Sequence, residues 1–193
     1  KDSVFDDVEF LMEKMKRLQR LMLNQDVVSL RVGTTPEKIV INEAKRNFTC
    51  LYLYHYNVDA VIVNHIYPEE AMKGYFHKWV ELQAEGLREI QESFSEVPRF
   101  YVELQPGEIR TLRVLEEVGS NIFGAYNPDD VLFREEIYTI DREGRNLKIY
   151  LPFAYKEELR LEQDGKELVV GVRGESRRFS MPSEFVGEEI TGA

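Results

Sequence analysis

The amino-acid sequence predicts an α/β layer with a parallel sheet, followed by a small antiparallel β-sandwich. Three observations lead to this prediction. Strand-like and helix-like runs alternate over residues 27–118, and a turn-rich stretch follows at residues 127–130. Short runs with a two-residue period then occupy residues 133–181. Strand–helix alternation is typical of parallel sheets, whose right-handed crossovers place helices on the sheet faces.

The first predicted element is an amphipathic helix over residues 4–23, because its apolar residues recur at steps of three and four. The stripe is rich in methionine, which leaves two interpretations open. It packs against neighbouring helices, or it forms an adaptable surface for apolar clients, since methionine side chains are flexible and polarisable. The stripe consists of Val4, Val8, Leu11, Met12, Met15, Leu18, Leu21 and Met22.

Three strands are predicted near residues 28–33, 59–65 and 99–104, adjacent and parallel in one sheet. The middle run, Ala60–Asn64, is apolar without alternation, as expected for a parallel strand covered on both faces. Helices are predicted from the Thr35–Pro36–Glu37 start to about residue 54, over residues 69–93 and over residues 108–118. Thr35 suits the N-cap and Pro36 the first helical turn of the first of these.

The β-sandwich is predicted to begin near residue 133. Its strands are indicated by alternation at Leu147, Ile149 and Leu151 and again at Leu159 and Leu161. A further run, 168–172, follows the turn at residues 164–166. The sequence therefore divides into a part spanning residues 1–126 and a sandwich spanning residues 133–193.

The composition excludes some functions. The chain has 193 residues and a net charge of -10, which argues against non-specific binding of nucleic acid, because that needs a basic surface. Cys50 is the only cysteine, so an internal disulfide is excluded. The sequence shows no signal peptide and no apolar run of membrane-spanning length. These features predict a cytoplasmic protein.

The sequence carries no recognisable catalytic or metal-binding motif. It lacks Gly-x-x-x-x-Gly-Lys-Ser/Thr, the loop whose backbone cradles phosphates. His55, His65 and His77 lack the spacing of metal ligands. Cys50 lies in a predicted helix beside aromatic residues and is interpreted as a small apolar residue, not a nucleophile. We therefore predict no catalytic residue and no metal ligand in this chain.

Three segments together resemble a known family. They are the strand-to-helix passage of residues 29–46, the strand and turn of residues 58–68, and Leu104-Gln105-Pro106-Gly107-Glu108-Ile109-Arg110. Their order and spacing resemble the second half of the arsenite-pump and tail-anchored-protein-targeting ATPases, which are ArsA-like and anion-transporting. The resemblance covers about residues 1–126. It implies part of a P-loop NTPase-like domain whose N-terminal half is missing.

The resemblance also implies a set of binding residues. Asn64 would contact the adenine base of ATP, and the loop at Pro106 and Gly107 would lie against the same base. An amide suits this role because it offers both a donor and an acceptor. The alternative interpretation is that Asn64 only caps the end of its strand. ATP and Mg²⁺ would be cofactors of the intact protein, and the fragment alone would be inactive.

The end of the chain resembles the small heat-shock-protein-like β-sandwich that some bacterial members of this family carry. The resemblance lies in the runs 147–153, 159–162, 167–170 and 177–182, and Ile190–Ala193 would lead into a strand that is missing here. Phe153 stands where small heat-shock proteins usually have glycine. Chaperone activity therefore does not follow from this resemblance.

Three functions are left open: part of an ATPase, a protein-binding module without its own catalysis, and a purely structural α/β domain. The expected partners are ATP and the missing N-terminal half, with a homodimer, a protein client and a membrane partner all left open. The zinc-binding Cys-x-x-Cys pair that joins the eukaryotic targeting dimers is absent, so a zinc-clamped dimer is not expected. Arsenite is disfavoured because Cys50 alone cannot form a multi-cysteine metalloid site.

Overall fold

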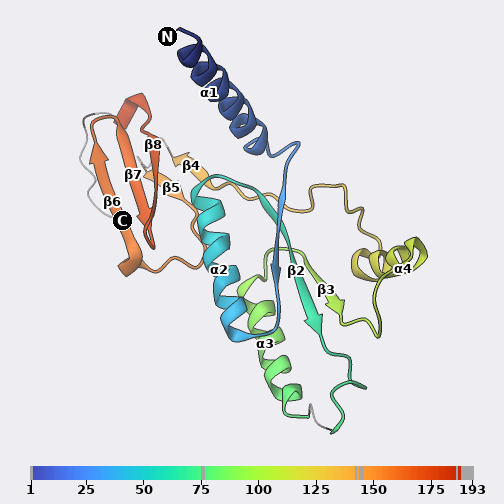
Figure 1. Cartoon of the computed structure of the whole chain (residues 1–193). Coiled ribbons are helices and arrows are strands. Elements are labelled where there is room, and N and C mark those ends of the chain that lie inside the picture. The colour runs from blue at the N-terminus through green and yellow to red at the C-terminus, as the bar shows by residue number, and fades with distance from the viewer. Residues whose placement is uncertain (1, 75–76, 142, 144–145, 186, 188–193) are drawn as a thin grey trace. The chain divides into compact units, whose positions relative to one another are not determined.

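The computed structural model of the chain is shown in Figure 1 and describes residues 2–74, 77–141, 143, 146–185 and 187. These residues form two compact units, each with its own core. The first unit consists of residues up to 44 together with residues 56–134. The second consists of residues 45–55 and the chain from residue 135 onward. The second unit thus takes up a short segment from the middle of the first.

The first unit is built on a parallel three-stranded sheet, as predicted. Strands β1 (Leu30–Thr34), β2 (Val58–Ile66) and β3 (Arg99–Glu103) lie in the order β1-β2-β3 (Figure 1). Val61 of the central strand pairs with Val32 on one side and Arg99 on the other. Val58, Ala60, Val61 and Val63 are fully buried. The continuous apolar run of β2 therefore reflects burial on both faces of the sheet.

Two helices of the first unit begin later than the sequence pattern predicts. Helix α3 (Trp79–Ser93) starts ten residues after the predicted start at residue 69. Gly74 precedes it with a φ of +79°, which a right-handed helix does not accommodate. Helix α4 (Leu112–Phe123) starts after Thr111, whose hydroxyl accepts a hydrogen bond from the backbone N–H of Val114. This N-cap sets the start of α4 four residues beyond the predicted one.

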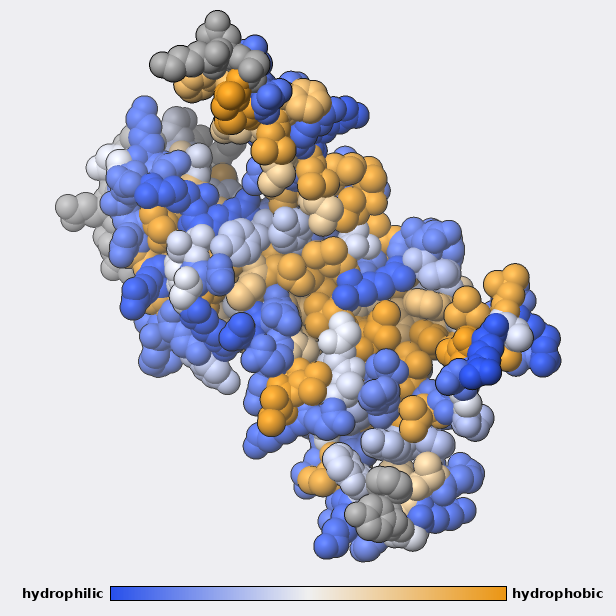
Figure 2. Space-filling view, viewed as in Figure 1, coloured by the Kyte–Doolittle hydropathy of each residue, from blue (hydrophilic) through white to orange (hydrophobic). Residues whose placement is uncertain are grey.

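Helix α1 (Asp2–Met22) exposes its apolar stripe over nearly its whole length. From Val4 to Leu21, the relative exposure of its large apolar residues runs from 49% at Val8 and Leu21 to 74% at Phe5, whereas Met22 is half-buried. Figure 2 shows these apolar side chains gathered along the helix. Exposure of a contiguous apolar stripe of this kind marks an interaction surface. No helix in the described part of the chain is long and apolar enough to cross a membrane.

Helix α2 (Lys38–Leu53) contributes to both cores. Its first half buries Ile41 and Ala44 in the first unit, and its second half belongs to the second unit. The helix begins at Lys38, and the carbonyl of Glu37 accepts a hydrogen bond from the N–H of Ile41. Thr35 is thus not the N-cap; its hydroxyl instead hydrogen-bonds the Glu37 carboxylate.

The second unit contains the predicted antiparallel β-sandwich. Strands β4 (Tyr138–Asp141) and β5 (Asn146–Ile149) form one sheet. Strands β6 (Leu159–Asp164), β7 (Glu167–Val172) and β8 (Glu175–Ser180) form the other. Two short 3-10 helices, Lys156–Glu158 and Ser183–Phe185, complete its described elements. Ile190–Ala193, which would lead into a further strand, lie outside the described residues.

The core of the sandwich also includes the end of helix α2. Leu53 packs with Leu168, Val170, Val172 and Phe179, and residues of the two-stranded sheet cover this cluster. The hydroxyl of the fully buried Thr49 donates to the carbonyl oxygen of Pro152 at 2.6 Å. Aromatic contacts add to this attachment: the Tyr52 and Tyr150 ring centroids are 5.8 Å apart, and those of Phe48 and Phe153 are 5.9 Å apart.

Phe153 adopts a left-handed backbone conformation with a φ of +63°. Glycine occupies this region without a steric penalty, whereas other residues pay roughly 1–2 kcal/mol. Three interactions hold Phe153 in place: its ring packs edge-to-face on Phe48, Lys45 lies over the ring, and its carbonyl accepts from Arg173 at 2.7 Å. The glycine usual at this position in small heat-shock proteins thus has a conformational reason.

Replacing Phe153 by glycine and by alanine tests whether the positive φ at this position destabilises the chain. Both changes remove the ring, but only glycine relieves the positive φ. We expect Phe153→Gly to be more stable than Phe153→Ala by about 1 kcal/mol, the reverse of the order at an ordinary loop position. Urea unfolding followed by circular dichroism measures the difference, and an alanine variant at least as stable as the glycine variant would contradict it.

Candidate functional site

The carboxyl ends of β1, β2 and β3 meet at one edge of the first unit's sheet, because the three strands are parallel. Thr34, Ile66 and Glu103 are the last residues of these strands. In open α/β sheets, ligands bind outside this edge. The segments that follow the three strands therefore form the first candidate for a site.

Asn64 lies in an irregularity near the end of β2. The pairing of β2 with β3 runs regularly up to Val63, then shifts before Ile66, so that Asn64 and His65 are unpaired there. The Asn64 side chain is exposed, and its Oδ1 accepts a hydrogen bond from the backbone N–H of His65 at 2.8 Å. His65 has a φ of +57°. The amide oxygen thus supports a bulge that turns the Asn64 side chain out of the strand.

The other half of the Asn64 amide has no hydrogen-bond partner among the described residues. Its Nδ2 group carries two donors, and the oxygen retains a second lone pair. The strand-end cap and the base contact are thus compatible, because the cap uses only one of the polar positions of the amide. The edge of an adenine ring presents both acceptors and a donor, which this amide matches.

Pro106 and Gly107 lie in the loop that leaves β3 at the same edge. The N–H of Leu104 donates to the carbonyl of Ile66 at 2.8 Å, which continues the pairing to the start of the loop. Pro106 and Gly107 are exposed, and a Cβ added at Gly107 would meet no atom within 4 Å. The structure therefore places all three sequence-predicted site residues at one sheet edge, Asn64 after one strand and the loop after its neighbour.

Cys50 is not part of this site, and of the described histidines only His65 touches it, through its backbone N–H. Cys50 lies on α2 in the second unit, where burial is the main cause that raises the pKa of its thiol, with the Glu175 carboxylate a smaller one. A raised pKa leaves less reactive thiolate at neutral pH. Within the described residues, no three histidine, cysteine or acidic side chains gather in an arrangement that could hold a metal ion.

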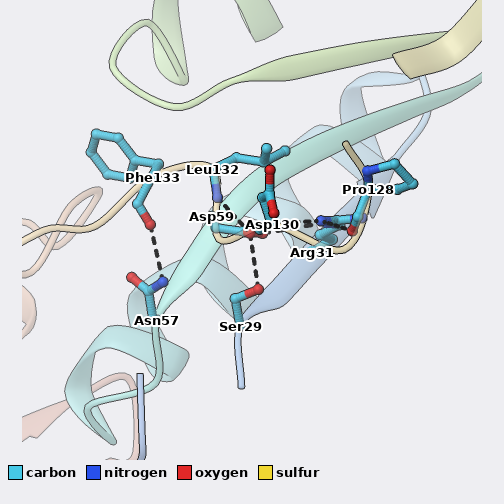
Figure 3. Close-up of polar contacts among 8 residues, drawn as sticks. All are labelled: Ser29, Arg31, Asn57, Asp59, Pro128, Asp130, Leu132 and Phe133. Carbon is cyan, nitrogen blue, oxygen red and sulfur yellow. Dashed lines mark hydrogen bonds and ion pairs between the residues drawn. The ribbon is translucent and has the colours of Figure 1, made fainter. Parts of the chain in front are cut away.

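A buried polar cluster at the amino ends of β1 and β2 was not predicted from the sequence. Asp59, which is fully buried in β2, accepts from Ser29 Oγ at 2.9 Å and from the N–H of Leu132 at 3.1 Å (Figure 3). Arg31 lies 3.4 Å from the same carboxylate and donates to the carbonyl of Pro128 at 2.6 Å. An acidic residue inside an apolar strand was the one signal available in the sequence.

This cluster fixes the connector that follows α4. Asn57 adds a hydrogen bond from its Nδ2 to the carbonyl of Phe133 at 3.0 Å (Figure 3). Residues 128–133 are thereby attached to the amino ends of β1 and β2. The cluster lies at the end of the strands away from Asn64, and its hydrogen bonds hold the connector to the sheet.

Comparison with known proteins supports the resemblance. The family model described as "Anion-transporting ATPase" matches residues 1–124, nearly two thirds of the chain. The chain belongs to the anion-transporting ATPase family. A second model, described as "HSP20-like domain found in ArsA", matches residues 142–193. The β-sandwich of this family member is thus of the heat-shock-like type.

Curated relatives of this chain have names that agree with the family. It is 33% identical over 190 residues to the "Putative arsenical pump-driving ATPase 1" of Aquifex aeolicus, covering 95% of the chain and 48% of the relative. It is 29% identical to the "Putative arsenical pump-driving ATPase" of Prosthecochloris vibrioformis and to that of Chlorobaculum tepidum, covering 97% of the chain and 45% of each relative. The chain therefore spans about half the length of these relatives.

Proposed function

We propose that this chain forms the adenine side of the ATP site in a longer, Mg²⁺-dependent ATPase. The observation that carries the proposal is the Asn64 amide, which is turned out of β2 at the carboxyl edge and keeps its Nδ2 donors unused by the described residues. Family membership supports nucleotide use in general. Pro106 and Gly107, exposed after the neighbouring strand, are proposed to close over the base.

In this proposal the chain binds and orients ATP but does not supply the phosphate chemistry. Hydrolysis of ATP transfers the γ-phosphoryl group to water, and bound Mg²⁺ neutralises charge on the phosphate oxygens. The sequence contains no phosphate-cradling loop. We propose that the groups that contact the phosphates and Mg²⁺ come from the remainder of the longer protein.

A second proposed function is protein binding through helix α1. The supporting observation is its apolar stripe, which is exposed from Val4 to Leu21 (Figure 2). Its methionines suit a surface that adapts to apolar partners, such as a client segment, a membrane-protein tail or a second subunit. The relatives' names refer to an arsenical pump, but arsenite is not proposed here, because Cys50 is the only cysteine. A cytoplasmic location is part of the proposal.

The purified 193-residue chain is expected to show no ATP hydrolysis above the buffer rate. The physical reason is that positioning and charge neutralisation at the phosphates supply nearly all of the catalysis of phosphoryl transfer. Release of inorganic phosphate, measured with and without Mg²⁺, tests this expectation. Turnover by the chain that disappears when one of its own residues is replaced would contradict the proposed division of roles.

A further inference from the structure

The first unit contains a cavity of about 300 Å³ at the carboxyl edge of the sheet, and Asn64, Pro106 and Gly107 are not among its lining residues. It lies among the start of helix α2, the segment after β2 and the first three turns of helix α3. Its size suits a small ligand or a single side chain. Its lining includes Glu37, Lys38, His65, Tyr67, Trp79, Glu85 and Glu89.

Two contacts build this cavity into the fold. Gln83 of α3, which is only 8% exposed, accepts from the backbone N–H of Tyr67 at 2.8 Å and donates to its carbonyl at 3.0 Å. Gly86, one turn further along α3, lets the helix approach the start of α2, because a Cβ there would lie 1.9 Å from the carbonyl oxygen of Pro36. The walls are therefore fixed before any ligand arrives.

Two aromatic rings meet at an angle in one wall. The ring centroids of Tyr67 and Trp79 are 6.1 Å apart with an interplanar angle of 53°. Trp79 remains 37% exposed, and its indole N–H has no hydrogen bond to any residue that the structure describes. Rings arranged in this way offer negative π faces to a cation and apolar surface to the chain that carries it.

Carboxylates outnumber cationic groups around the cavity. Three carboxylates, those of Glu37, Glu85 and Glu89, line it together with the ammonium of Lys38 and the imidazole of His65. Glu85 is exposed and has no ion pair within the described part of the chain. The charge therefore opposes an anionic ligand and favours a cationic one, since an opposite charge within a few ångströms stabilises the charged form of a ligand.

We propose that this cavity binds an organic cation, namely an ammonium or guanidinium group carried on a short apolar chain. The rings of Tyr67 and Trp79 contact the apolar chain and the charged head, and the Glu85 carboxylate pairs with the head. The group belongs to a free amine or to a lysine or arginine side chain of another protein. The proposal does not depend on the ATP site and stands if that assignment fails.

Trp79 provides a direct readout, because it is the only tryptophan in the sequence. The test titrates the 193-residue chain with ethylguanidinium while its fluorescence and the indole N–H NMR signal are recorded. We expect saturable changes with an affinity on the order of 10–100 mM, since one exposed cation–π contact and one exposed ion pair are modest. No saturable change in either signal overturns the proposal.

Two matched variants separate the cavity from the helix surface. Glu85→Gln keeps the shape of the side chain and removes its charge, so the affinity should fall about two- to fivefold. Glu92→Gln makes the same change at an exposed position of α3 outside the cavity and should leave the affinity unchanged. Equal affinities in Glu85→Gln and the parent chain overturn the proposal.

Further titrations identify the source of the cation. A capped tripeptide with a central arginine that binds more tightly than ethylguanidinium assigns the cavity to a protein side chain, whereas equal or weaker binding assigns it to a free amine. Benzoate tests an anionic ligand of similar size, and ATP tests a nucleotide. Saturable binding of either at the cavity, with no binding of ethylguanidinium, overturns the proposal.

Discussion

Replacing Asn64 by alanine in the full-length protein is expected to weaken ATP binding roughly 5- to 150-fold. The loss of a paired amide leaves polar edges of the base unsatisfied, which costs on the order of 1–3 kcal/mol. Contacts to the phosphates would remain, so binding should weaken without vanishing. The preference for ATP over GTP should fall as well. Nucleotide titration, followed by competition between the two triphosphates, measures both effects.

The structure allows a second variant that tests the two polar groups of the Asn64 amide separately. Oδ1 of Asn64 supports the bulge through the N–H of His65, whereas Nδ2 is unused by the described residues. Asn64→Asp keeps an oxygen for the bulge and removes the donors. We expect it to weaken ATP binding at least as much as alanine does. It should also shift the preference toward GTP, because a carboxylate accepts from the N–H groups of guanine.

His65→Asn serves as the control for this experiment. His65 is exposed beside Asn64 and has a positive φ, which asparagine tolerates better than alanine does. We expect it to leave ATP affinity unchanged. If Asn64→Ala changes neither affinity nor base preference, the amide serves only as a strand-end cap, and the proposed adenine site is wrong.

Replacing Asp59 by alanine is expected to destabilise the first unit by about 3–5 kcal/mol. The change removes a buried carboxylate that accepts from Ser29 and Leu132 and pairs with Arg31. Breaking such a cluster on one side leaves buried donors without partners, which costs more than the intact cluster contributes. The connector at residues 128–133 should also loosen. Urea unfolding followed by Trp79 fluorescence reports on this unit, because Trp79 lies within it.

Two further variants serve as comparisons for Asp59→Ala, one at the same position and one at an exposed position of the connector. Asp59→Asn keeps the shape of the side chain but replaces one acceptor with a donor. The free energy of unfolding should therefore fall by less than in Asp59→Ala, by about 1–3 kcal/mol. Asp129→Ala changes an exposed carboxylate in the connector and should alter stability by less than about 0.5 kcal/mol. An Asp59→Ala variant within 0.5 kcal/mol of the parent chain, an order-of-magnitude limit, would show that the cluster is not stabilising.

The local sequence pattern predicted the strands in which the same face, or both faces, are buried along the length of the strand. The run of residues 60–63 is apolar because both faces of β2 are covered there, and the two-residue alternation of Leu147 and Ile149 reflects one partly buried face. The order and direction of β1, β2 and β3 followed from the strand–helix alternation. Helix boundaries were less predictable, since the start of α3 depends on the conformation of Gly74 and that of α4 on the cap at Thr111.

The sequence by itself determined the family, the α/β layer, the sandwich and the sheet edge at which Asn64 and Pro106 lie. Only the tertiary structure decided that the second half of α2 belongs to the sandwich core, through Leu53 and Thr49. The structure alone also joined Asp59 to a connector some 70 residues away and placed Trp79 beside Tyr67. The physical reason is range: periodicity records which side of an element is buried, whereas the partner that buries it is chosen by contacts between distant residues.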